Sequence, residues 1–175
     1  MEEISAQGIS ARSGLRALCD LTETVCRVLI GAAVAAIVAI TVGAVWFRYV
    51  LEAPLSWTEQ VSGMVFVWIT FLGTAVLYRR MLHIAIDMIV LMLPVAAQKL
   101  VYWLNQVLVL VLALMMIWFG GQHAIANMPQ TFGALEISPS WFYFAAPVAG
   151  ALIVLYWIEK LFDPRFRVPD GEVHL

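Results

Sequence analysis

The sequence predicts an all-α membrane protein with four transmembrane helices. Of its 175 residues, 63% are hydrophobic and only 13% are charged, whereas soluble domains are about half apolar and about one quarter charged. The apolar residues form continuous runs, which excludes the alternating pattern of β-barrel strands. This composition also excludes an ordinary soluble enzyme, a nucleic-acid-binding protein and a disordered chain.

Four apolar runs are long enough for membrane spans, because a hydrocarbon core of about 30 Å takes about 20 helical residues. The predicted spans cover residues 28–47, 60–78, 99–121 and 140–159, within one membrane domain at residues 21–162. Residues 1–20 contain no apolar run and are expected to form a loose tail that turns helical at the earliest from Leu15 onward. Residues 163–175 contain two prolines and a glycine and are expected to form a second tail.

The segment after the second span has two possible structures. Residues 81–97 are apolar apart from a proline, His83 and Asp87, so they form either a fifth span or a helix along the membrane surface. Lys and Arg concentrate on the cytoplasmic side of membrane proteins. With four spans and a cytoplasmic N-terminus, nine of the ten Lys and Arg residues lie inside and only Arg48 lies outside, whereas five spans divide them evenly. We therefore expect a short interfacial amphipathic helix at residues 81–93 and cytoplasmic locations for both termini.

Small residues recur along several spans, mostly at intervals of four. Such a ridge lets a neighbouring helix approach closely. Packing inside the four-helix bundle and docking to another membrane protein both agree with this pattern. The residues of the ridge are Gly31, Ala35, Ala39, Gly43, Gly73, Ala146 and Gly150.

Ionisable side chains are almost absent from the interior of the predicted spans. Secondary transporters place such groups near the membrane midplane and surround them with broken helices. Here the third span offers only Asn105 and Gln106, which are expected to form hydrogen bonds between helices. The sequence also lacks paired histidines on one side, a phosphate-binding loop and a nucleophile motif, so no metal, cofactor or catalytic site is predicted. The chain thus lacks the parts of a self-sufficient transporter.

Two polar clusters lie at the ends of the spans. At the outer end, Ser56 and Glu59 have capping-box spacing for the second helix, and Arg48 and Trp57 lie nearby in the sequence. This cluster is interpreted either as a helix cap alone, or as a cap with an Arg48–Glu59 ion pair or a charge offered to a partner.

At the inner end, Arg79 and Arg80 precede His83 and Asp87 on one predicted helix face. The cluster is interpreted either as a solvated face with a local His83–Asp87 contact, or as a docking surface for a partner or for lipid headgroups.

Residues 47–87 resemble the small integral membrane subunit of tripartite ATP-independent periplasmic (TRAP) transporters, the DctQ type. The shared pattern begins with Arg48 at the end of the first helix and with Trp57 and Glu59 at the entry to the second. An FVW-x-TFLG core, an Arg-rich exit and an H-I-x-x-D element follow. Two positions differ, with Gln60 and Gly63 where the family often has an acid and an arginine.

The resemblance implies a non-enzymatic scaffold subunit in the bacterial inner membrane, in contact with the lipid bilayer, with no cofactor and no nucleic-acid partner. Its expected partners are a large multi-span permease subunit, which holds the ion and substrate sites, and a periplasmic solute-binding protein. Such a complex imports an organic acid or similar solute and is driven by an ion gradient. The alternatives are a self-assembling channel or small carrier, and a membrane enzyme or electron-transfer subunit.

Overall fold

The computed structural model of the chain describes residues 2–80, 94–131 and 133–162. Its helices are α1 (Glu2–Tyr49), α2 (Thr58–Arg80), α4 (Val95–Ala126), α5 (Ser140–Tyr143) and α6 (Ala145–Phe162). Within the described residues, four helical segments are long and apolar enough to cross a membrane, the fourth running through α5 and α6. The predicted fold class is therefore confirmed. The predicted interfacial helix at 81–93 and the predicted tail at 163–175 lie outside the described residues.

Helix α1 differs most from the sequence-based expectation. It begins at Glu2, so residues 2–20 are helical and do not form the loose tail that was expected. The expectation relied on the absence of an apolar run, which decides where a chain enters the membrane but not where a helix starts. The segment contains no proline. Its later turns also have tertiary partners, because Leu15 packs against the core cluster that includes Cys19.

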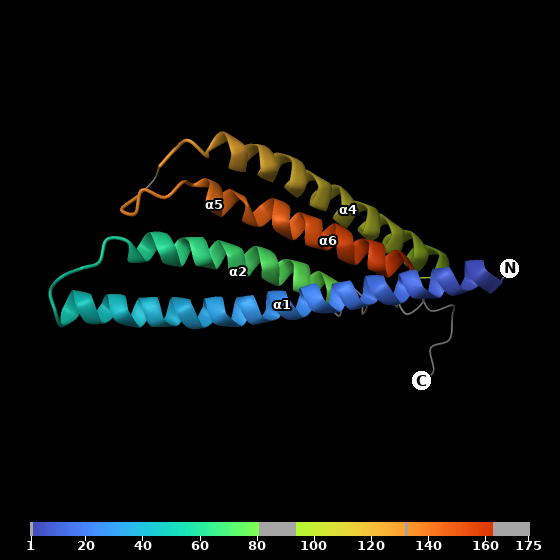
Figure 1. The fold of residues 1–175 in the computed structure, drawn as a ribbon. Helices are drawn as coiled ribbons and strands as arrows, with labels where there is room; N and C mark the ends of the chain where they lie inside the picture. Colours follow the sequence, from blue (N-terminus) through green and yellow to red (C-terminus); the bar gives the residue numbers. More distant parts are fainter. Residues whose placement is uncertain (1, 81–93, 132, 163–175) are drawn as a thin grey trace.

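The helices pack as two pairs joined by α2 and α6. Helix α1 packs mainly on α2, α2 packs on α6, and α6 packs on α4. Figure 1 shows the α1–α2 pair and the α4–α6 pair coming together at the end that carries the N-terminus and separating toward the other end. Each of the four long helices contributes one or two residues to the main buried cluster. These residues are Cys19, Ala75, Ala113, Ile153 and Tyr156.

Helices α4 and α6 come closest at two glycines. A methyl group built on Gly150 would lie 2.8 Å from the carbonyl oxygen of Ala113 and 2.9 Å from the side chain of Ile117. One built on Gly120 would lie 2.9 Å from the ring of Pro147. Only glycine leaves room for this backbone approach, as small-residue motifs do at membrane helix interfaces.

Candidate functional site

The end of the molecule where the two helix pairs meet carries a buried charge cluster centred on Arg79. This side chain, in the last turn of α2, is only 10% exposed. Its guanidinium donates to both carboxylate oxygens of Glu159 on α6, each at 2.8 Å. It also donates to Glu23 and to Asp20 on α1, each at 2.5 Å. One arginine therefore connects three helices through four hydrogen bonds, one more than the three N–H groups of a lysine ammonium could donate.

Two further cations complete this group, which we call the Arg79 cluster and define as Asp20, Glu23, Arg79, Arg80, Glu159 and Lys160. Arg80 donates to Glu23 at 2.7 Å and is half exposed. Lys160 is 4% exposed and donates to the backbone carbonyl of Tyr78 at 2.8 Å, with its ammonium 3.6 Å from the centre of the Tyr78 ring. The three carboxylates and three cations balance in formal charge; Arg79, Glu159 and Lys160 are at most 10% exposed, whereas Asp20 is 71% and Arg80 49% exposed.

A second polar layer connects α2, α4 and α6 beside the Arg79 cluster. Gln106 is 7% exposed, accepts a hydrogen bond from the Tyr78 hydroxyl at 3.0 Å and donates to the Tyr102 hydroxyl at 3.1 Å. The indole of Trp157 donates to the backbone carbonyl of Gln106 at 3.1 Å. The sequence predicted that the Gln106 amide would form hydrogen bonds between helices, and its side chain does so with Tyr78.

The sequence identified only part of this site. Arg79 and Arg80 were among the predicted polar residues, but their partners Asp20, Glu23 and Glu159 were not. Asp20 and Glu23 are three residues apart, so they share a helix face, and this spacing was a usable signal. His83 and Asp87 lie outside the described residues. No group of three or more metal-ligating side chains comes together in the part of the chain that the structure describes.

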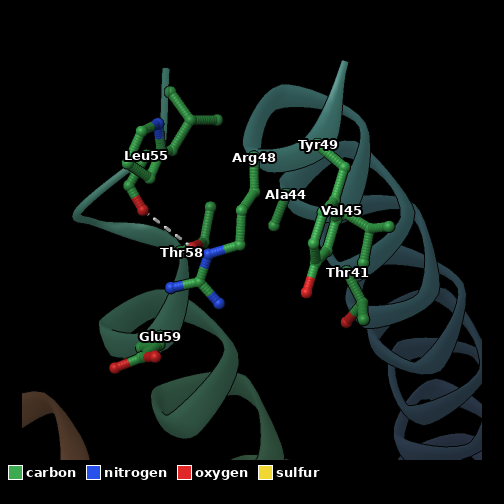
Figure 2. A pocket seen from close by; sticks show the side chains of 9 residues that line it. Thr41, Ala44, Val45, Arg48, Tyr49, Leu55, Thr58 and Glu59 are labelled. Carbon is green, nitrogen blue, oxygen red and sulfur yellow. Dashed lines mark hydrogen bonds between the residues drawn. The ribbon is translucent and has the colours of Figure 1, made fainter. Parts of the chain in front are cut away.

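Of the predicted outer cluster, Arg48 and Glu59 line a cleft of about 270 Å³ between the end of α1 and the start of α2, whereas Ser56 and Trp57 do not. Figure 2 shows the Arg48 side chain reaching from α1 toward the first turn of α2, where Thr58 and Glu59 lie. No ion pair within 4.0 Å joins the described residues Arg48 and Glu59, so the ion pair, one of the interpretations of this cluster, is not formed. Trp57, which is partly buried, immediately precedes α2.

The predicted capping box is also wrong. Helix α2 begins at Thr58, which places Trp57 rather than Ser56 at the position before the helix. Ser56 is exposed. The Thr58 hydroxyl instead donates to the carbonyl of Leu55 at 3.0 Å and stabilises the turn that enters the helix.

The small-residue ridge is divided between two environments. Gly150 is buried against α4, its neighbour Ala149 is also buried, and Ala146 faces Gly120 in the α4–α6 interface. The rest of the ridge has no close neighbour: methyl groups built on the glycines would contact nothing within 4 Å, and the alanines are exposed. These open positions are Gly31, Ala35, Ala39, Gly43 and Gly73.

Comparison of the sequence with known proteins relates this chain to a family of membrane transport proteins. The model of the DctQ component of tripartite ATP-independent periplasmic transporters matches residues 37–167. The sialic acid TRAP transporter small permease protein SiaQ of Vibrio cholerae is 30% identical over 129 residues, covering 74% of this chain and 75% of that protein. A putative TRAP transporter small permease protein of Haemophilus influenzae is 26% identical, covering 72% and 78%.

A longer relative contains a similar segment. The sialic acid TRAP transporter permease protein SiaT of Haemophilus influenzae is 30% identical over 126 residues, which are 71% of this chain but only 20% of that protein. The isethionate TRAP transporter permease protein DctMQ of Oleidesulfovibrio alaskensis is 28% identical over 111 residues, which are 18% of its length. The DctQ family model covers residues 37–167, which is most of this chain. The chain therefore belongs to the DctQ family, the small membrane component of TRAP transporters, as its sequence predicted.

Proposed function

We propose that this chain is a rigid scaffold that holds a large multi-span permease subunit in the inner membrane. The proposal rests on the sialic acid TRAP transporter permease protein SiaT, in which the segment similar to this chain makes up only 20% of a longer permease protein. A segment that is fused to a permease in one protein and separate in another is expected to contact the same permease in both. The remaining four fifths of such a chain would correspond to the large subunit.

The charge distribution of the chain favours a scaffold role over a direct role in transport. The stretch at 28–47 in α1 contains no charged residue, and the charged residues of α2 and α6 lie in their end turns. In the Arg79 cluster each of the three carboxylates accepts from a guanidinium. A fixed, internally satisfied cluster stabilises a helix bundle and leaves ion coupling to the partner.

In this proposal the complex imports an organic acid or a similar solute that a periplasmic solute-binding protein delivers, and an ion gradient drives the import. The test is solute uptake by cells that lack this chain, with and without a restored copy, together with purification of the tagged chain in mild detergent. We expect lost uptake and a roughly equimolar large membrane protein in the preparation. Normal uptake in the deletion strain would refute the scaffold role, and flux through liposomes containing this chain alone would favour the channel alternative.

The proposed orientation places both termini and the Arg79 cluster on the cytoplasmic side and Arg48 on the periplasmic side. It follows from the positive-inside rule. Ser56 and Gly14 are exposed residues at opposite ends of the spans, so single cysteines at these positions test it in a background without Cys19 and Cys26. A membrane-impermeant maleimide should label S56C in intact spheroplasts and G14C only after permeabilisation. The reverse pattern would invert the topology.

A further inference from the structure

The cleft between the ends of α1 and α2 contains two opposite charges that do not pair with each other. Arg48 is exposed, and no hydrogen bond or ion pair joins its guanidinium to another described residue. Glu59, in the first turn of α2, lines the same cleft. The guanidinium nitrogens of Arg48 and the carboxylate oxygens of Glu59 are more than 4.0 Å apart, which leaves space between them for a third group.

The position of the cleft in the membrane restricts what that group can be. Arg48 is the penultimate residue of α1 and Glu59 the second residue of α2, and both helices are of membrane-spanning length. The cleft is therefore at the level where the hydrocarbon core ends and lipid headgroups begin. Tyr49 lines it, and Trp46 on the same turn is 58% exposed, as aromatic residues are at this level.

The lining of the cleft matches a small amphipathic group. Thr41 and Thr58 add hydroxyl groups to the two charges, while Ala44, Val45 and Leu55 supply an apolar wall. A volume of about 270 Å³ is slightly below the range of about 300–1,000 Å³ that is typical of pockets for drug-sized ligands. This volume is large enough for a lipid headgroup.

We propose that this cleft binds the headgroup of a phospholipid whose phosphate carries a primary ammonium, as in phosphatidylethanolamine. The guanidinium of Arg48 takes the phosphate, since arginine recognises phosphate oxygens in a bidentate manner. The carboxylate of Glu59 takes the ammonium, whose N–H groups it accepts. A lone arginine at a helix end often extends its charge into water without a specific ligand, but that behaviour gives no role to Glu59 in the same cleft.

The proposal predicts a preference among lipids that have the same acyl chains. Phosphatidylglycerol offers a phosphate but no cation for Glu59, and phosphatidylcholine offers a cation without N–H donors. We expect the full-length chain to bind phosphatidylethanolamine about tenfold more tightly than either of the other two, a ratio that corresponds to about 1.4 kcal/mol. Native mass spectrometry of the purified chain, titrated with each lipid in detergent, measures the three dissociation constants.

Two substitutions separate the roles of the two charges. Arg48→Gln should weaken binding of both phosphatidylethanolamine and phosphatidylglycerol. Glu59→Gln should weaken phosphatidylethanolamine alone, so that its advantage over phosphatidylglycerol is lost. The matched controls are Arg27→Gln, an exposed arginine on the same helix, and Glu52→Gln, an exposed acid in the adjoining loop; neither lines the cleft, and both should bind as the native chain does.

Three results would overturn the proposal. Equal binding of the three lipids would show that the cleft does not select a headgroup. A preference for phosphatidylglycerol that Glu59→Gln leaves unchanged or increases would assign a simple phosphate site. An effect of Arg27→Gln as large as that of Arg48→Gln would mean that only overall charge matters.

Discussion

Replacement of Arg79 by glutamine tests whether the Arg79 cluster holds the bundle together. Arg79 is 10% exposed, and two of its partners, Glu23 and Glu159, are 14% and 7% exposed. Removing one member of a buried ion pair costs about 3–5 kcal/mol because an uncompensated charge remains. Asp20 is 71% exposed, so its pair with Arg79 adds little. We expect a loss of about 3 kcal/mol, which lowers the folding equilibrium constant by about a factor of 100.

The assay is unfolding of the purified chain in mixed micelles with increasing sodium dodecyl sulfate, followed by tryptophan fluorescence. The matched control is Arg80→Gln, because Arg80 is the neighbouring residue, is 49% exposed and donates to Glu23. Its loss should cost less than about 1 kcal/mol. Arg79→Lys should fall between the two, because lysine keeps the charge but has only three N–H donors for the four hydrogen bonds that Arg79 makes.

The result that would refute this reasoning is an Arg79→Gln chain as stable as Arg80→Gln. In that case the contacts of Arg79 would contribute no more than a surface pair. A double substitution gives an independent check. Glu159→Gln in the Arg79→Gln background should recover part of the lost stability, because it removes the buried carboxylate that Arg79 had neutralised. A further full loss on adding Glu159→Gln would show that the two residues act separately.

Four other substitutions test helix packing and one hydrogen bond in the same unfolding assay. Gly150→Ala should destabilise the chain by about 1–3 kcal/mol through overpacking against α4, while Gly31→Ala should stay within about 0.5 kcal/mol; equal effects would contradict the close contact at Gly150. Gly43→Leu should leave the stability of the isolated chain unchanged but reduce the yield of the complex with the large subunit, and an unchanged yield would indicate that this face contacts lipid. Trp68→Phe removes the hydrogen bond from the indole to the carbonyl of Trp141 at 3.0 Å and should cost about 1 kcal/mol, whereas a neutral result would mean that water replaces this bond.

The sequence predicted the number of spans and their approximate limits because hydropathy is a local property. The second span was expected at 60–78 and the helix covers Thr58–Arg80; the third was expected at 99–121 and the helix covers Val95–Ala126. The helix ends extend past the apolar runs, since polar residues continue a helix into the interface. The start of α1 at Glu2 was not predicted because the polar residues that precede its apolar run are also helical.

The sites were harder to predict because they depend on which helices become neighbours. Arg79 was recognised as polar, but its pairing with Glu159, eighty residues later, follows only from the contact between α2 and α6. The small-residue pattern has the same limitation. Gly31 and Gly150 belong to similar four-residue repeats, yet only Gly150 meets another helix within the chain.

Helix α1 is much longer than a membrane span and extends well past the Arg79 cluster. Forty-eight residues at about 1.5 Å each make a rod of about 72 Å, more than twice the thickness of the hydrocarbon core. Asp20 and Glu23 pair with Arg79 of α2, and the 18 helical residues before Asp20 extend about 27 Å beyond this contact. The first turns of α1 and its membrane span are thus one continuous helix, and the Arg79 cluster contacts that helix near the junction of the two.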